Sequence, residues 1–194
     1  MVRGQLTFIS GGVRSGKSAY AERLLVRESR GNDGRLVYIA TGRQTDAEMV
    51  ERIDKHQLDR SELNWKTFEQ PVNMEKLLPF IENGDLVLWD CVTTWLANEL
   101  YDGADIGKPC IEKPNCMENK ERKLYVTIDV LLSKVRHLVI VSNEVLDELA
   151  SPYDEVRIYS EWLGRIHQKL VEKADTAIEM EYGLAKTWKG EDAN

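Results

Sequence analysis

Eight consecutive residues near the amino terminus have the types and spacing of a phosphate-binding loop. They are Gly11, Gly12, Val13, Arg14, Ser15, Gly16, Lys17 and Ser18, and they fit the pattern G-x-x-x-x-G-K-[ST]. The glycines allow the backbone to wrap closely around a phosphate chain, so that successive N–H groups point inward. In such a loop Lys17 reaches the β and γ phosphates, and the Ser18 hydroxyl binds Mg²⁺. Because the motif follows an apolar run and opens a helical pattern, it predicts a nucleoside triphosphate site rather than a chance glycine turn.

An apolar run that ends in a carboxylate supplies the second group that such a site needs. Residues 86–90 read Leu-Val-Leu-Trp-Asp. In P-loop enzymes an acidic residue at the end of such a strand helps to hold Mg²⁺. Asp90 is therefore predicted to be a metal ligand, with the alternative that it only caps the following turn.

Three basic side chains lie at helical spacing in an otherwise acidic chain. Arg52, His56 and Arg60 are four residues apart, so a helix over residues 46–60 places them on one stripe. Arginines bind phosphate oxygens in a fork, and a neutral imidazole between them is a competent nucleophile toward phosphorus. The alternative is a histidine that only packs or hydrogen-bonds, with the arginines paired to nearby acids. Spacing alone favours this alternative.

The sequence around these motifs alternates between short apolar runs and amphipathic stretches. The runs predict strands at 6–10, 36–40, 86–90, 138–142 and 177–182, with an edge strand at 65–68. The amphipathic stretches predict helices at 18–27, 46–60, 73–82, 93–101, 123–134 and 153–174. Together with the phosphate-binding loop, this alternation predicts an α/β fold of the P-loop NTPase type, with a doubly wound, mainly parallel sheet flanked by helices.

Length and charge narrow the possible classes of protein. The chain has 194 residues, which is enough for one domain over residues 1–194 with a core of its own. Its net charge of −7 argues against nucleic acid and anionic membranes as partners, because phosphate surfaces attract a basic face. No apolar run approaches the roughly 20 residues of a membrane-spanning helix, and the amino-terminal run is too short for a signal peptide. We therefore expect a cytoplasmic protein.

The cysteines suggest neither a disulfide framework nor a metal site. There are three of them, Cys110 and Cys116 have five residues between them, and no histidine lies nearby. We expect reduced thiols, one buried and two on a loop. That loop, residues 102–122, contains two prolines, two glycines and many charges, and it is predicted to be a surface insertion.

Further motifs, taken in order along the chain, resemble those of one known family. After the phosphate-binding loop come Val-Tyr-Ile-Ala-Thr at 37–41 and Arg-Ile-x-x-His-x-x-x-Arg at 52–60. They are followed by Trp-x-Thr-x-Glu at 65–69, Asp-Cys-Val-Thr-Thr-Trp-Leu-x-Asn at 90–98 and Val-Ser-Asn-Glu-Val at 141–145. Over nearly its whole length the chain resembles the bifunctional adenosylcobinamide kinase/adenosylcobinamide-phosphate guanylyltransferase family of cobalamin biosynthesis.

The resemblance implies two reactions in sequence. First, the γ-phosphate of ATP or GTP is transferred to the hydroxyl of the aminopropanol arm of adenosylcobinamide. His56 then attacks the α-phosphorus of GTP, releases pyrophosphate and carries GMP to adenosylcobinamide phosphate, which leaves as adenosylcobinamide-GDP. Because the family places its nucleophilic histidine where His56 stands, the resemblance reverses the preference that spacing alone gives.

The resemblance also implies a set of site residues. Lys17 and His56 would be the catalytic residues, and Ser18 and Asp90 would hold Mg²⁺. Nucleotide contacts are expected from the whole phosphate-binding loop and from Ala40, Thr41, Gly42, Gln57, Leu58, Asp59, Arg60, Glu69 and Asp90. Members of the family look like homotrimers, so a homo-oligomer is expected.

Two other functions fit part of this pattern. A P-loop small-molecule kinase without nucleotidyl transfer would keep residues 11–18 and Asp90 but would not use His56. A nucleotide-dependent ATPase or switch would act on a protein or DNA partner, and the net charge of −7 argues against DNA. A trapped GMP adduct on His56 would separate the bifunctional enzyme from both.

Overall fold

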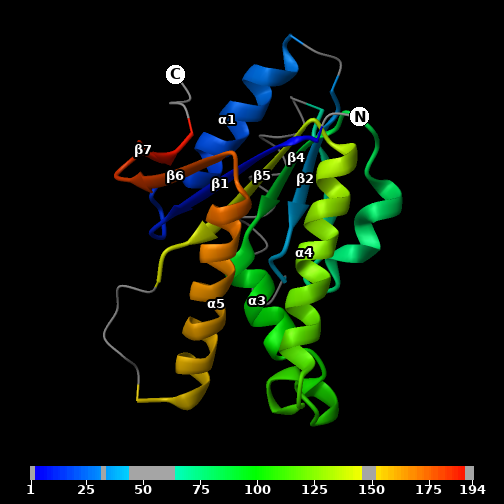
Figure 1. Cartoon of the computed structure of the whole chain (residues 1–194), viewed down its shortest axis with the longest axis vertical. Helices are drawn as coiled ribbons and strands as arrows, with labels where there is room; N and C mark the ends of the chain where they lie inside the picture. The colour runs from blue at the N-terminus through cyan, green and yellow to red at the C-terminus, as the bar shows by residue number, and fades with distance from the viewer. Residues whose placement is uncertain (1–2, 32–33, 44–63, 146–151, 191–194) are drawn as a thin grey trace.

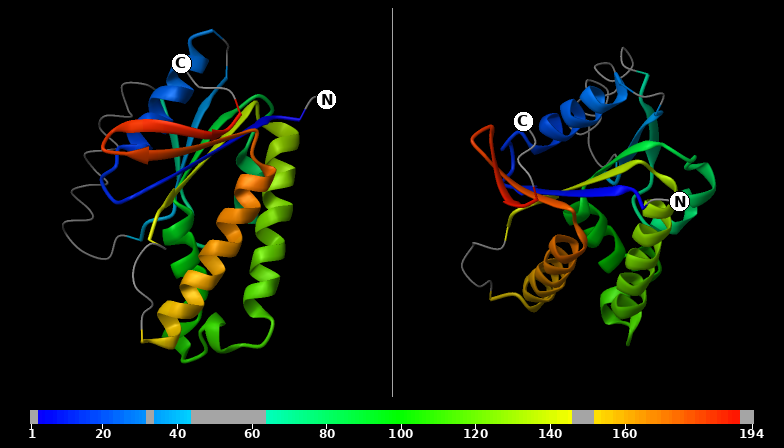
Figure 2. Two further views of the ribbon diagram at one scale, coloured as in Figure 1. Left: turned by 60° about the vertical axis from the view of Figure 1, so that its left-hand side comes forward. Right: turned by 45° about the horizontal axis from the view of Figure 1, so that its top comes forward.

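The computed structural model describes residues 3–31, 34–43, 64–145 and 152–190. In these ranges a seven-stranded sheet has helices on both faces (Figures 1 and 2). Its order is β3-β2-β4-β5-β1-β6-β7, and all neighbouring strands are parallel except β6 and β7. The strands are β1 (Gln5–Gly11), β2 (Leu36–Ala40), β3 (Lys66–Glu69), β4 (Leu86–Asp90), β5 (His137–Asn143), β6 (Thr176–Glu181) and β7 (Leu184–Lys189). The predicted α/β class with a mainly parallel sheet is confirmed.

Helices form a layer on each face of this sheet. Their bounds are α1 (Lys17–Ser29), α3 (Val92–Leu100), α4 (Cys116–Lys134) and α5 (Asp154–Lys173), with 3-10 turns η1 (Met74–Phe80), η2 (Ala104–Ile106) and η3 (Cys110–Glu112). Helix α1 covers one face, and α3, α4 and α5 cover the other (Figure 2). None of the helices in the described ranges is long and apolar enough to cross a lipid bilayer.

The two layers explain why the central strands are apolar without alternation. On β4, Val87 and Trp89 pack in the core formed with α3, α4 and α5. The intervening Leu86 and Leu88 pack in the core formed with α1. A strand that is buried on both faces reads as a continuous apolar run, which is the pattern that predicted the parallel sheet.

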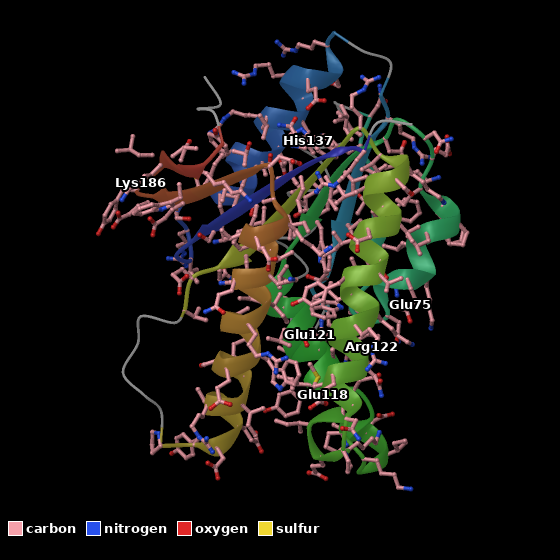
Figure 3. The ribbon with its side chains drawn as sticks, viewed as in Figure 1. Glu75, Glu118, Glu121, Arg122, His137 and Lys186 are labelled. Atoms are coloured by element: carbon pink, nitrogen blue, oxygen red, sulfur yellow. A yellow bond between two sulfur atoms is a disulfide. The ribbon has the colours of Figure 1, made fainter. Side chains whose placement is uncertain are left out.

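Strand β7 is absent from the sequence prediction, whereas the six predicted strands lie within one residue of the observed bounds. It pairs antiparallel with β6 through a tight turn in which Tyr182 and Gly183 both have positive φ. Most of β7 is exposed, and the Lys186 ammonium lies 3.7 Å from the ring centroid of Trp188 (Figure 3). An exposed edge strand lacks the buried apolar run on which the prediction relied.

Helix α4 begins seven residues before the predicted start. The prediction placed it at 123–134, and the structure extends it back to Cys116. The added turns are rich in charged residues, which hide the apolar periodicity, yet Met117 is buried in the core. The predicted insertion at 102–122 therefore contains η2, η3 and the first turns of α4. The predicted helix at 73–82 is the 3-10 turn η1, and the one at 46–60 lies outside the described residues.

The prediction of reduced thiols is wrong for two of the three cysteines. Cys110 and Cys116 form a disulfide, with their Cα atoms 5.6 Å apart. The chain between η3 and α4 turns back on itself, and this separation lies within the range that a disulfide spans. An odd number of cysteines does not exclude one local pair. Cys91 is the buried free thiol that was expected.

A buried histidine fastens α5 to the sheet. His167 Nε2 lies 2.7 Å from the Ser142 hydroxyl of β5, and the His167 ring packs against Phe8 of β1 at a centroid distance of 5.3 Å. Burial lowers the pKa of His167 to about 4. The imidazole is therefore neutral in the folded protein over the physiological pH range.

Because His167 stays neutral in the folded protein, the free energy of unfolding should decrease as the pH is lowered. In the unfolded chain the pKa of a histidine is about 6.5. As the pH drops from about 6.5 toward 4, the unfolded state takes up a proton here that the folded state refuses, and the free energy of unfolding should fall by about 3 kcal/mol. His167→Asn keeps a hydrogen-bonding partner for Ser142 and does not titrate. Urea unfolding at a series of pH values should show the loss in wild type and not in this variant; parallel curves would contradict the assignment.

Candidate active site

The phosphate-binding loop joins β1 to α1 at the carboxyl edge of the sheet. Gly11 ends β1 with a φ of 156°, and a Cβ there would lie 2.4 Å from the Met180 carbonyl oxygen of β6. Gly16 precedes the helix with a φ of 91°, a conformation that favours glycine. The Lys17 side chain folds back over the loop, and its Nζ donates to the Gly12 carbonyl oxygen at 2.9 Å. Close packing against β6 thus requires glycine at position 11, and the backbone conformation favours it at position 16.

The β6–β7 hairpin supports this loop from the side. The Gly183 N–H donates to the Ser15 carbonyl oxygen at 3.0 Å. A Cβ on Gly16 would lie 3.6 Å from the Gly183 Cα, so the turn of the hairpin lies directly against the loop. The loop is therefore held between its own helix and the last strand pair.

Sheet register brings the other predicted groups to the same edge. The Cα of Gly11 pairs with that of Asn143 on β5. Ala40 pairs with Asp90 on β4 and with Glu69 on β3. Because the carboxyl ends of parallel strands meet at one edge, the phosphate-binding loop, residues 40–42, Glu69 and Asp90 all border the same region.

One oxygen of the Asp90 carboxylate is held by a buried tyrosine. The Tyr38 hydroxyl, on the neighbouring strand β2, donates to Asp90 Oδ2 at 2.8 Å. Tyr38 is buried, and its ring packs edge-on against Trp65 at a centroid distance of 6.2 Å. Among the described residues no donor reaches Asp90 Oδ1, so this oxygen can face a ligand.

The turn after β2 is tied to its neighbours through Thr41. Its N–H donates to the Asp90 carbonyl oxygen at 3.0 Å, and its hydroxyl accepts from the Cys91 N–H at 2.8 Å. Asn98 of α3 donates from Nδ2 to the carbonyl oxygens of Thr41 at 2.8 Å and Pro71 at 3.2 Å. Asn98 thereby fixes residues 40–42 relative to the chain that leaves β3.

Sequence reasoning missed Tyr38 and Asn98 as parts of this region. Both stand inside motifs that carried the family resemblance, at 37–41 and 90–98. Their location inside these motifs was the signal that the sequence offered, because a tyrosine or an asparagine at such a position does not by itself indicate a functional role. Their roles emerge only once β2, β4 and α3 are neighbours.

Five of the predicted site residues lie outside the described ranges. They are His56, Gln57, Leu58, Asp59 and Arg60. The nucleophile and the phosphate clamp of the second reaction therefore stay predictions.

A separate cavity of about 670 Å³ lies at the opposite edge of the sheet. It is lined by His137 at the start of β5, whose Nδ1 lies 2.7 Å from the Glu28 carboxylate and whose Nε2 lies 2.8 Å from the Thr7 hydroxyl (Figure 3). These groups satisfy one another, and the amino ends of the strands place them away from the phosphate-binding loop. The cavity does not belong to the candidate active site.

The arrangement at the carboxyl edge suits phosphoryl transfer. A glycine-rich loop with a lysine can neutralise a triphosphate, and Asp90 at the end of β4 lies on the same edge of the sheet. One strand, β5, separates the loop strand from the Asp90 strand.

Known proteins are similar in sequence to most of this chain. The CobU family, described as cobinamide kinase / cobinamide phosphate guanyltransferase, matches residues 7–187. The bifunctional adenosylcobalamin biosynthesis protein CobU of Escherichia coli (strain K12) is 30% identical over 175 residues, covering 88% of this chain and 92% of that protein. The bifunctional adenosylcobalamin biosynthesis protein CobP of Pseudomonas aeruginosa is 30% identical over 184 residues, covering 94% and 96%. The chain therefore belongs to the cobinamide kinase / cobinamide phosphate guanyltransferase family.

Proposed function

We propose that this chain is a bifunctional enzyme of adenosylcobalamin biosynthesis. It phosphorylates the aminopropanol hydroxyl of adenosylcobinamide with ATP or GTP, and then transfers GMP from GTP to the product to give adenosylcobinamide-GDP. The observation that carries the proposal is the phosphate-binding loop at the end of β1, on the same edge as Asp90, in a chain whose residues 7–187 match the family.

In the kinase step the loop and Lys17 bind and orient the phosphates. Their N–H groups and ammonium would stabilise the charge that builds on the β and γ phosphates as the γ-phosphoryl group leaves. Val13, Arg14 and the other loop residues form the cradle.

Ser18 and Asp90 would hold Mg²⁺. The donor set is a hydroxyl in the first turn of α1 and the carboxylate oxygen that Tyr38 leaves unoccupied, and hard oxygen ligands are those that Mg²⁺ prefers. When bound, the ion would neutralise charge on the transferred phosphate. The hydrogen bond from Tyr38 would hold the carboxylate in one orientation.

Further nucleotide contacts are proposed from the turn after β2 and from the end of β3. The turn is Ala40, Thr41 and Gly42, held in place by Asn98, and Glu69 is exposed at the end of β3 on the same edge. The segment with Gln57, Leu58, Asp59 and Arg60 completes the set by resemblance.

The guanylyl step uses His56 as the nucleophile. A nitrogen of its neutral imidazole forms a bond to the α-phosphorus of GTP, and pyrophosphate leaves with the electron pair of the broken P–O bond. An oxygen of adenosylcobinamide phosphate then forms its bond to the same phosphorus. The N–P bond breaks, and the imidazole is restored.

A homotrimer in the cytoplasm is proposed from the resemblance. The edge strand β7 supports self-association, because Leu184 and Trp188 are mostly exposed on it and Tyr182 is 91% exposed at its turn. Sedimentation of the purified chain tests the trimer.

The decisive experiment is intact-protein mass spectrometry after incubation with GTP and Mg²⁺ in the absence of corrinoid. Wild type should gain the mass of one GMP, and His56→Ala should gain none, because only the imidazole forms the covalent bond. A wild type that binds nucleotide but gains no mass would reduce the chain to a P-loop kinase. An adduct on both proteins would place the nucleophile elsewhere.

A further inference from the structure

Asn143 ends the strand that separates the phosphate-binding loop from Asp90. Strand β5 lies between β1 and β4, and Asn143 pairs in register with Gly11, the first residue of the loop. The next residue, Glu144, donates its N–H to the Gly11 carbonyl oxygen at 2.8 Å. Asn143 therefore lies at the carboxyl edge of the sheet, on the strand between the phosphate-binding loop and Asp90.

Hydrogen bonds to α3 fix the orientation of its side chain. The Asn143 Nδ2 and backbone N–H both donate to the Thr93 hydroxyl oxygen, at 3.0 Å and 3.3 Å. Thr93 Oγ1 in turn lies 2.9 Å from Cys91 Sγ, and Asn143 Nδ2 also donates to this sulfur, at an N–S distance of 3.9 Å. The Thr93 carbonyl oxygen accepts from the Tyr159 hydroxyl of α5 at 3.1 Å, so the anchor is itself held.

The anchored amide leaves its oxygen without a donor. Both N–H groups of the carboxamide face Thr93 and Cys91, and no described residue donates to Asn143 Oδ1. An amide oxygen accepts hydrogen bonds and repels phosphate oxygens, which are acceptors too. Asn143 Oδ1 is therefore suited to accept a hydrogen bond from a hydroxyl group.

We propose that Asn143 Oδ1 accepts a hydrogen bond from the acceptor alcohol and aims its oxygen at the γ-phosphorus. This assignment rests on the proposed kinase function. The alcohol oxygen forms the new P–O bond while the bond from the γ-phosphorus to the β–γ bridging oxygen breaks, and the nucleoside diphosphate leaves with that electron pair. The alcohol proton passes to water, because an amide is not a base at neutral pH. Asn143 thus contributes orientation of the acceptor and no proton transfer.

The two reactions of the enzyme give the test an internal reference. Asn143→Ala should lower kcat for formation of cobinamide phosphate by about 10- to 100-fold, the cost of a misplaced reactant. The rate at which GTP alone guanylylates the protein should not change, because that step has no alcohol acceptor. Asn119→Ala, on the exposed face of α4, is the matched control and should leave both rates at their wild-type values.

A second variant covers the case in which Asn143→Ala does not fold. Thr93→Val keeps Asn143 and removes the hydroxyl that anchors it, and it should lower the same kcat by a smaller factor while guanylylation persists. An unchanged kcat in the folded variants would overturn the assignment, as would an equal loss of both reactions. A wild-type protein that forms no cobinamide phosphate would overturn the proposed kinase itself, which is a separate result.

Discussion

Replacing Lys17 with alanine should lower kcat for phosphoryl transfer to adenosylcobinamide by about 10²- to 10³-fold, with a smaller effect on the KM for nucleotide. The side chain is only 6% exposed, and its Nζ is held 2.9 Å from the Gly12 carbonyl oxygen. A positive charge fixed on a buried side chain stabilises the charge that develops on the phosphates in the transition state. Steady-state kinetics of cobinamide phosphate formation measure both parameters.

A surface lysine provides the comparison. Lys169 is exposed on α5, where its Nζ pairs with the Glu172 carboxylate at 2.7 Å. Lys169→Ala should leave kcat at its wild-type value. If Lys17→Ala retained the wild-type kcat as well, the Lys17 side chain would not contribute to catalysis of phosphoryl transfer.

The parts of the site that sequence predicts are those whose chemistry is local. A phosphate cradle needs consecutive residues with fixed types, so Gly11 to Ser18 could be recognised without any knowledge of the fold. Asp90 could be recognised because the end of an apolar run is also local information. Strand positions followed for the same reason, since two-faced burial leaves an unbroken apolar run.

The supporting residues depend on which elements become neighbours. Tyr38 and Asp90 are 52 positions apart, and their contact requires β2 beside β4. The role proposed for Asn143 depends on the strand order β4-β5-β1, which no local sequence pattern encodes. Such roles could be assigned only after the sheet order was known.

The errors in the fold have the same origin. The charged first turns of α4 look like a solvated loop until Lys120 is seen to pair with Glu99 of α3. The Cys110–Cys116 pair depends on a local turn that spacing did not reveal. Strand β7 is stabilised by pairing with β6 rather than by burial, so hydrophobic pattern carries little signal for it.

Replacing Lys120 with methionine should lower the free energy of unfolding by about 3 kcal/mol, because it leaves a buried carboxylate without its counter-charge. Glu99 is 1% exposed, and the Lys120 Nζ lies 2.5 Å from Glu99 Oε2 and 3.0 Å from Asp102 Oδ2. Burial works to lower the pKa of Lys120, but its hydrogen bonds to Glu99 and Asp102 outweigh this and raise it. Lys120 is therefore charged in the folded protein. Urea unfolding measures the change.

An exposed pair on the same helix is the matched control. Lys123 of α4 lies 3.2 Å from the Glu75 carboxylate, with the lysine side chain 59% exposed (Figure 3 labels Glu75). Lys123→Met should cost at most about 1 kcal/mol, since water screens the charges. Equal losses of unfolding free energy in Lys120→Met and Lys123→Met would show that the buried pair with Glu99 contributes no more to stability than the exposed pair does.

The double variant Glu99→Gln with Lys120→Met separates loss of the charge pair from loss of packing. A neutral amide at position 99 can still accept from the Asn73 N–H and the Trp95 indole, which Glu99 Oε1 does at 2.6 Å and 3.1 Å. The double variant should therefore be more stable than Lys120→Met alone, which additive effects would not produce.

Because Glu99 adjoins Asn98, which holds the turn after β2, Lys120→Met should also weaken nucleotide binding, and the double variant should restore part of it.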